Sequence, residues 1–360
     1  MFKIDKKDIK EITIYFIISR LLIFVFVYLC SEKLQSQGLN FWTLNDSNHY
    51  LNIAANGYQT AYEIAFFPLL PFLIHFLGKI PVVILNIIIS YISCFLIYDL
   101  IKEIFPNKSP LLMTKIWIYS PIAVFTCMLY TESIFVFLTL LTFYLYRKKE
   151  KYLLQGILLG LAVCTRAPAA ILFFVLFIFM VINIYKKQET IKNLLIMYIP
   201  ATIISCIYPI YLQISVGKWN AFSIVQYECW NKAHSNIFKT IWYSIYGIYS
   251  HSGQYKLICI ADTLFYFFFI GLIIYSIIKY RKDKSKYDIL LFTLLTLLVV
   301  SSTCVTSNTT GTSATVSYYR YFYGCVGYML LLPDNKIYYY LQRIIFFITT
   351  CLFLMNYYFF

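Results

Sequence analysis

The chain has 360 residues, of which 61% are hydrophobic and only 13% are charged, with a mean hydropathy of +0.71. Soluble domains carry about 45–50% apolar and about 25% charged residues, so this composition excludes a soluble globular protein and a disordered chain. The net charge of +14 comes from basic clusters between apolar runs. Such clusters are typical of membrane topology signals rather than of a surface that binds nucleic acid.

About eleven apolar runs come close to the roughly 17–25 residues that a helical membrane span needs. They lie at 11–30, 80–100, 110–129, 132–146, 152–165, 167–185, 193–213, 257–278, 288–304, 320–332 and 338–358. Only helices and closed barrels cross a bilayer, and these runs are too long and too uniformly apolar for barrel strands. The sequence therefore predicts an all-α polytopic membrane protein, with a single transmembrane domain over residues 1–360.

The basic residues indicate how this domain is threaded. With the N-terminus in the cytoplasm, most of the 30 Lys and Arg residues fall in short inner loops or at the inner ends of spans. Three longer loops then lie outside, at 31–79, 214–256 and 305–319, and all four histidines lie in the first two. The inner loops lack a Gly-rich phosphate-binding motif. We therefore expect any chemistry on the outer face, with a substrate delivered in or across the membrane.

Two short helices are expected in the first outer loop. Asn45 and Asp46 offer an N-terminal cap and Gly57 a C-terminal stop, which predicts a first helix between them. Pro68 suits the first turn of a second helix, which would end at Gly78. At about 11 residues each helix is too short to span the bilayer, so both are predicted to lie at the membrane interface.

Few acidic residues are available for a site on the outer face. Those at or near it are Glu32, Asp46, Glu63, Glu132, Glu228 and Asp262. Asp46 begins the first short helix, beside His49 and Tyr50, where the membrane border would hold it against a lipid substrate. It is the candidate general base. The alternative is that its carboxylate only caps the helix.

Five segments, in chain order, resemble the PIG-V family of polytopic mannosyltransferases, which belongs to the GT-C superfamily and includes the second mannosyltransferase of GPI-anchor assembly. They are residues 46–71 of the first loop, Ser120-Pro121 with 130–133, 156–166 ending in Thr165-Arg166, Gln226 with Trp230, and Arg320-Tyr321. The family usually has Trp directly before the first-loop Asp, a place that Asn45 holds here. The length favours a compact bacterial relative of the GPI enzymes.

The resemblance implies a GT-C bundle that transfers mannose, with inversion, from a polyprenyl-phosphate mannose donor of the dolichol-phosphate type to a glycolipid or glycan acceptor. Asp46 would take the proton of the acceptor hydroxyl. The site would face outward from a bacterial cytoplasmic membrane or, in a eukaryote, into the lumen of the endoplasmic reticulum. The donor is a substrate, so no cofactor is expected. A small partner subunit in the membrane is left open.

Three cationic or ionisable residues are candidates for the phosphate of the donor: Arg166, Arg320 and His49. Arginine offers a planar fork to phosphate oxygens, and both arginines lie at the outer ends of predicted spans. The alternatives are that the arginines only reach for the interface and that His49 is an ordinary solvated loop residue.

Five further residues are candidates for binding the acceptor or the sugar: Tyr50, Glu132, Gln226, Trp230 and Tyr321. Glu132 could bind acceptor hydroxyls or could instead cap the helix that follows it. Gln226 and Trp230 could hydrogen-bond and stack a sugar, or could belong to an aromatic belt at the interface.

The histidines and cysteines show no metal-ligand spacing, so we expect metal-independent chemistry. Three rival interpretations remain open at this point: a GT-C transferase for another sugar, a lipid or glycan transporter, and a non-catalytic membrane scaffold. A transporter would be expected to show internal repeats and ionisable residues deep within spans. The sequence shows few of these features.

Overall fold

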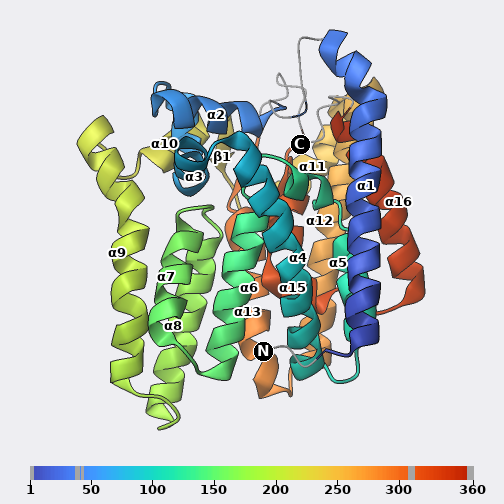
Figure 1. The fold of residues 1–360 in the computed structure, drawn as a ribbon. Coiled ribbons are helices and arrows are strands. Elements are labelled where there is room, and N and C mark those ends of the chain that lie inside the picture. Colours follow the sequence, from blue (N-terminus) through green and yellow to red (C-terminus); the bar gives the residue numbers. More distant parts are fainter. Residues whose placement is uncertain (1–3, 37–40, 42–43, 307–312, 355–360) are drawn as a thin grey trace.

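The computed structural model describes residues 4–36, 41, 44–306 and 313–354. It is a bundle of helices, most of which run roughly along one axis (Figure 1). The longer helices are α1 (Lys6–Ser36), α4 (Lys79–Ile104), α6 (Glu132–Lys148), α7 (Tyr152–Val163), α8 (Ala169–Tyr185), α9 (Ile191–Val216), α12 (Gly253–Tyr280), α13 (Tyr287–Val300) and α16 (Lys336–Leu354). The predicted all-α architecture is confirmed.

Five helices are long and apolar enough to cross a membrane, within the described part of the chain. They are α1 as far as Cys30, α4, α9, α12 and α16. The helices α7 and α8 are apolar but shorter. An integral membrane protein is therefore supported, whereas the predicted number of about eleven spans is not established by these helices. The last predicted span ends beyond the described residues, since α16 is followed only as far as Leu354.

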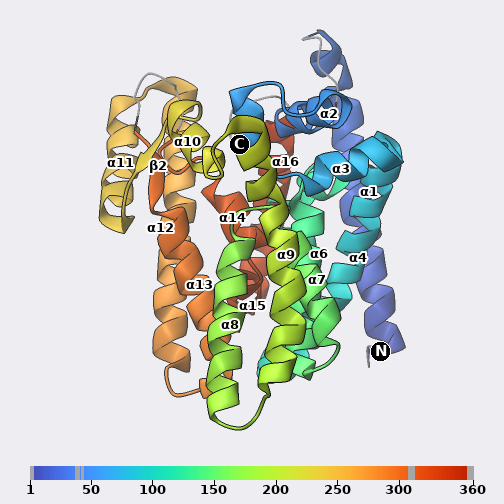
Figure 2. The ribbon, with the colours of Figure 1, turned by 90° about the vertical axis from the view of Figure 1, so that its left-hand side faces the viewer.

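Several elements, most of them short, gather at one end of the bundle, which we call the site end. They are α2 (Asp46–Asn56), η2 (Ala61–Ala65), α3 (Leu69–Leu77), α10 (Ala221–Glu228), β1 (Lys232–His234), α11 (Ile237–Ser250) and β2 (Thr303–Val305). Figures 1 and 2 both show α2, α3 and α10 at this end. The strands β1 and β2 pair antiparallel, with Lys232 opposite Val305. Segments from two predicted outer loops and the end of the predicted span 288–304 thus meet at the site end.

The two short helices of the first loop are confirmed. The first runs from Asp46 to Asn56 and stops at Gly57, whose φ of 72° is accessible to glycine at little cost. The second follows Pro68 and ends before Gly78, whose φ is 84°. The short helix η2 between them was not predicted.

Two predicted spans are broken, and these predictions of continuous helices were wrong. The run 110–129 forms α5 (Pro110–Ile118) and the 3₁₀ turn η3 (Ala123–Cys127), because Pro121 lacks an N–H and disfavours helix at the residue before it. The run 320–332 forms α14 (Tyr318–Gly324) and α15 (Val326–Leu331), separated by an extended Cys325. Both stretches are buried inside the protein, where irregular backbone is tolerated at membrane depth.

Hydrogen bonds attach the first loop to the ends of the long helices. The amide of Leu69, the first residue of α3, donates to the carbonyl of Cys164 just after α7, at 3.0 Å. The Tyr208 hydroxyl of α9 donates to the carbonyl of Ile64 at 2.6 Å. Along their length α7 and α9 touch closely, since a Cβ placed on Gly156 would lie 2.0 Å from the carbonyl oxygen of Met197. The first loop therefore lies across the ends of α7 and α9.

Candidate active site

Four charged side chains from four separate segments meet at the site end. Arg320 of α14 donates from Nε to Oε1 of Glu132 at 2.8 Å, and its Nη2 lies 2.7 Å from the same oxygen. Its Nη1 donates to Oδ2 of Asp46 at 3.0 Å. Arg166, in the turn between α7 and α8, donates from Nη1 to Oε1 of Glu132 at 2.5 Å. We call Asp46, Glu132, Arg166 and Arg320 the charged cluster.

The charged cluster is unequally buried. Glu132 is 1% and Arg320 6% exposed, whereas the side chain of Asp46 is 26% exposed. Two carboxylates and two guanidinium groups balance one another, as buried charges require. The Arg320 guanidinium also lies over the rings of Phe125 and Tyr130, at 4.7 and 5.0 Å. Asp46 is thus the carboxylate of the cluster that a substrate can reach most directly.

Both carboxylates occupy the first position of a helix, yet both pair across the fold. The cap position before α2 belongs to Asn45, which has φ 48° and forms no side-chain cap bond. Thr131, before α6, likewise forms no side-chain cap bond. A negative charge in the first turn is favourable in either helix. The side-chain oxygens of Asp46 and Glu132 are nevertheless used to hold the arginines, which capping alone does not explain.

Aromatic rings form a second group beside the charged cluster. The His49 ring stacks on Phe66, with centroids 4.7 Å apart and planes at 21°, and lies edge-on to Trp230 at 6.1 Å. Trp230 also meets Phe66 at 5.8 Å, and Tyr50 meets Phe66 edge-on at 5.0 Å. His49 is half-buried in this stack rather than freely solvated. We call His49, Tyr50, Phe66 and Trp230 the aromatic group.

Tyr50 connects the two groups. It is buried, and burial followed by the nearby Asp46 raises the pKa of its phenol far above the ordinary value. Its phenol therefore stays protonated and can donate a hydrogen bond. The charges of Asp46, Arg166 and Glu132 also act on the pKa of this phenol, so the charged cluster and Tyr50 influence each other electrostatically.

Of the remaining predicted residues, Tyr321 lies at the charged cluster, and Gln226 forms no hydrogen bond with it in the described part of the chain. Tyr321 joins the charged cluster, because the Arg166 guanidinium lies 4.9 Å from the centroid of its ring. Gln226 is half-buried on α10, and none of the hydrogen bonds found among the described residues joins its side chain to another predicted site residue. Sequence reasoning missed Phe66 as the centre of the aromatic group. The signal was available, since Phe66 lies within the first-loop segment that carries the family resemblance.

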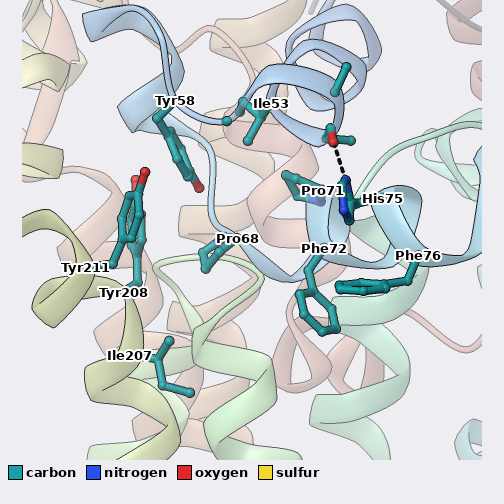
Figure 3. Close-up of a pocket in the computed structure, with 13 residues that line it drawn as sticks. Ile53, Tyr58, Pro68, Pro71, Phe72, His75, Phe76, Ile207, Tyr208 and Tyr211 are labelled. Carbon is teal, nitrogen blue, oxygen red and sulfur yellow. Dashed lines mark hydrogen bonds between the residues drawn. The ribbon is translucent and has the colours of Figure 1, made fainter. Parts of the chain in front are cut away.

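An apolar groove lies beside the first-loop helices, with a cavity volume of about 360 Å³. Figure 3 shows Tyr58 after α2, Pro68 and Phe72 at α3, and Tyr208 and Tyr211 of α9 around the same space. The groove starts close to the charged cluster. Pro68 lines the groove, and the amide of the next residue, Leu69, donates to the carbonyl of Cys164, two positions before Arg166. The sequence analysis did not identify this groove.

No three His, Cys, Asp or Glu side chains come together as a metal ion would need, within the described ranges of the chain. The carboxylates of the charged cluster are instead held by arginine. Metal independence stays an expectation.

Two comparisons with known proteins indicate what this chain is similar to. A family model described as dolichyl-phosphate-mannose-protein mannosyltransferase matches residues 61–212, from the first loop into α9. GPI mannosyltransferase 2 of Schizosaccharomyces pombe is 32% identical over 121 residues. The chain resembles the PIG-V mannosyltransferases. This confirms the resemblance to a GT-C enzyme that the sequence predicted.

The matches cover part of each protein. The alignment with the yeast enzyme takes in 31% of this chain and 26% of the yeast enzyme. The matched part therefore spans about a quarter of the length of that relative. The family model includes Glu132 and Arg166, whereas Asp46 and Arg320 lie outside the matched residues. No solved structure matches the chain.

Proposed function

We propose that this protein transfers mannose from a polyprenyl-phosphate mannose donor to a hydroxyl of a glycolipid or glycan, at the site end of the bundle. The observation that carries the proposal is the charged cluster, in which Arg320 holds Asp46 and Glu132 together while Arg166 holds Glu132. A base beside two guanidinium groups is the set of side chains that displacement of a phosphate from a sugar requires.

In this proposal Asp46 is the general base. Its carboxylate takes the proton of the acceptor hydroxyl while that oxygen attacks the anomeric carbon of mannose. The bond between this carbon and the phosphate oxygen breaks on the opposite side, so the configuration inverts and polyprenyl phosphate leaves. The greater exposure of Asp46 relative to Glu132 supports this choice of base. Asp46 would exchange its bond with Arg320 for one with the acceptor.

Arg166 and Arg320 are assigned to the leaving phosphate. Negative charge accumulates on the phosphate as the sugar departs, and preorganised guanidinium groups stabilise it without moving. Oε1 of Glu132 contacts both arginines, so this carboxylate sets their separation. Its Oε2 has no hydrogen-bond partner among the described residues, and we assign it to a hydroxyl of the acceptor.

The aromatic group is proposed to bind a sugar ring. Apolar faces of sugars stack on aromatic side chains, and Trp230 and His49 are only half-buried, so part of each ring is accessible. Tyr50 would donate a hydrogen bond to a sugar hydroxyl. Tyr321, stacked on Arg166, would keep that guanidinium turned toward the phosphate. Gln226 is proposed to contact the outer part of the acceptor from α10.

The apolar groove is proposed to hold the first isoprene units of the donor. A phosphate on Arg166 would lie near the start of α3, and the chain could then pass Pro68 toward Phe72 and Tyr211. These side chains are largely apolar and come from α3 and α9 (Figure 3).

The test is transfer of radiolabelled mannose from synthetic polyprenyl-phosphate mannose by the purified protein, with membrane glycolipid extracts as acceptors. Wild type is compared with Asp46→Asn, with and without EDTA, and with donors that carry other hexoses. Mannose transfer that Asp46→Asn abolishes and EDTA spares would support the activity, the sugar, the assigned base and the expected metal independence. Transfer of another hexose alone would replace the sugar, and undiminished transfer by Asp46→Asn would remove the assigned base.

The alternative of a transporter is tested in the same preparation. The protein is reconstituted in liposomes that contain a fluorescent polyprenyl-phosphate sugar, and movement between leaflets is followed by chemical quenching. Movement without transfer would overturn the enzymatic proposal. We further propose that the N-terminus lies in the cytoplasm and the site end outside, which protease protection of terminal and loop tags in sealed vesicles would check.

A further inference from the structure

The stretch between α5 and α6, residues 119–131, crosses the interior of the bundle without forming α-helix. All of its residues are buried, and only the short turn η3 is regular. Buried backbone groups need hydrogen-bond partners, most of all at membrane depth, where water is absent. The stretch ends at Glu132, so whatever holds its backbone also sets where that carboxylate lies. We call residues 119–131 the connecting segment.

Asn86 of α4 binds the last part of the connecting segment. Its side chain is fully buried, and its Nδ2 donates to the carbonyls of Met128 and Tyr130, at 2.7 and 3.2 Å. Both acceptors are carbonyls, so the amide nitrogen must be the atom that faces them. At the other end of the connecting segment, Nη1 of the buried Arg20 donates to the carbonyl of Ile118 at 3.4 Å. Buried polar side chains of α1 and α4 thus hold both ends.

The same carbonyls are tied to the first loop. The buried Ser47 hydroxyl donates to the carbonyl of Leu129 at 3.4 Å, and the Tyr130 hydroxyl donates to the carbonyl of Leu44 at 3.3 Å. Three successive carbonyls, at 128, 129 and 130, are therefore bound by the side chains of Asn86 and Ser47. Leu44 and Ser47 lie on either side of Asp46 in the chain, so these bonds connect residues 128–130 with the position of Asp46.

The other side of the connection is Glu132. Tyr130 also supports Arg320, whose guanidinium lies 5.0 Å from the centre of its ring. Arg320 reaches Asp46 and Glu132 at once, and a rigid fork can do so only while the two carboxylates keep their separation. Since Asn86 touches neither carboxylate in the described contacts, it acts through the backbone of residues 128–130.

We propose that Asn86 is a positioning residue that sets the separation of Asp46 and Glu132 by binding the carbonyls of Met128 and Tyr130. Its effect on transfer rests on the proposed function, whereas its effect on the coupling of the two carboxylates does not. Without the two amide hydrogens, the carbonyls at 128 and 130 are left unpaired and the segment shifts toward other donors. Glu132 then moves relative to Asp46, and Arg320 loses one of its two partners.

The test compares Asn86→Leu, which keeps the size of the side chain, with Ser90→Ala one turn further along α4. Ser90 is fully buried too, but its hydroxyl donates only within its own helix, to the carbonyl of Ile87. We expect Asn86→Leu to lower kcat for mannose transfer on the order of 10²-fold, with the KM for donor little changed. Ser90→Ala is expected to stay near wild type in both. Equal losses in the two variants would overturn the inference.

A second measurement needs no substrate. The Tm of the purified full chain is measured for Asn86→Leu, for Asp46→Asn and for the two together. If Asn86 sets the separation of Asp46 and Glu132, the combined Tm shift is smaller than the sum of the two single shifts. Each change alone already disrupts the same arrangement. Additive shifts would overturn the inference even where transfer is confirmed. Non-additive shifts in a protein that transfers no sugar would keep it and overturn the proposed function.

Should Asn86→Leu fail to fold, Tyr130→Phe takes its place. This variant keeps the ring under Arg320 and removes only the hydroxyl that donates to Leu44. The inference expects the same kcat loss in a smaller degree and the same non-additivity with Asp46→Asn. Because Asn86 keeps both carbonyls in this variant, it tests the link between the connecting segment and Asp46 through Leu44. Wild-type kcat and additive Tm shifts in Tyr130→Phe would overturn that link, and with it the inference that Asn86 sets the separation of the two carboxylates.

Discussion

The two ends of the bundle use charge in different ways. At the end opposite the site end, which carries the N-terminus in Figure 1, carboxylates and basic side chains form single pairs, either between neighbouring elements or within one turn. These pairs are Lys115 with Glu11, Lys148 with Glu103, Arg147 with Asp288 and Lys286 with Asp283. At the site end, four charges from segments far apart in the chain share contacts and are largely withdrawn from solvent.

The difference teaches what each set of charges contributes. An exposed pair adds about 0–1 kcal/mol, so pairs such as Lys148 with Glu103 join loops without deciding the fold. A buried cluster loses so much hydration that apolar side chains would often stabilise the same volume better. That four charges are kept at the site end despite this cost supports the catalytic role that we propose for them. Changing one acidic residue at each end separates these roles.

The largest effect is expected for Asp46→Asn. Loss of a general base lowers transfer about 10²–10⁴-fold, while the Tm falls less than in Glu132→Gln because Arg320 loses Asp46 but keeps Glu132. The measurement is kcat for mannose transfer together with thermal unfolding in detergent. Asp283→Asn at the opposite end is the control and should leave kcat unchanged. Equal losses in both variants would contradict a special role for the site end.

Glu132→Gln is expected to destabilise the protein most. It leaves two buried guanidinium groups without their shared carboxylate, and breaking a buried ion pair in this way costs about 3–5 kcal/mol. Glu103→Gln should cost no more than about 1 kcal/mol, since its pair with Lys148 is exposed. Denaturant unfolding of both variants gives the comparison. A similar free energy of unfolding for the two would refute the contrast between the ends.

Arg320→Lys keeps the positive charge but replaces the planar guanidinium group by a single ammonium group. One ammonium group cannot hold Asp46 and Glu132 as the guanidinium does through three nitrogens. We expect transfer to fall on the order of 10²-fold, the usual result of losing one preorganised donor. Arg147→Lys at the opposite end should retain transfer. Retention of full transfer by Arg320→Lys would show that charge alone is sufficient.

A smaller effect is expected in the groove. Phe72→Ala removes an apolar wall and should raise the KM for a long-chain donor by a few-fold, because each isoprene CH₂ that is buried contributes about 0.8 kcal/mol. The KM for a donor with a single isoprene unit should change less. A series of donors of increasing chain length measures this. Identical KM changes for short and long donors would exclude the groove as the chain site.

The smallest effect concerns the first loop. Burial favours the neutral form of Glu63, but the amides of Thr60 and Gln59 and the side chain of Asn52 lower its pKa below the ordinary value. A carboxyl whose pKa is lower in the folded state stabilises the fold above its unfolded pKa and loses this contribution as the pH falls through its folded pKa. Glu63→Gln should therefore cost about 1 kcal/mol at pH 7 and less in acid. Thermal unfolding of both proteins at pH 7 and pH 4 tests this, and an equal Tm difference at the two pH values would contradict it.

The elements of this protein could largely be read from local sequence. Gly57, Pro68 and Gly78 bounded the first-loop helices correctly, because caps and breakers act within one helical turn. Apolar runs located most of the long helices, because an apolar run is also a local feature of the sequence. The continuous spans predicted at 110–129 and 320–332 were wrong, since hydropathy does not distinguish a segment buried in protein from one that faces lipid.

Sequence reasoning could select the residues of the site but could not predict how they are arranged. The family resemblance selected Asp46, Glu132, Arg166 and Arg320 one by one, but nothing local joins Arg320 to a carboxylate 188 or 274 positions away. Their meeting depends on how α2, α6, α7 and α14 pack. The same packing made Phe66 the centre of the aromatic group and left Gln226 apart from it.

The sequence by itself determined that this chain is a helical membrane protein with short helices in its first loop and a resemblance to mannosyltransferases. Composition and cap residues act over a few positions, so they can be read without a fold. Only the tertiary structure decided which charges share a cluster, that Asn86 binds the connecting segment, and that a groove lies beside α3. Those features depend on contacts between residues far apart in the chain, and close packing alone brings such residues together.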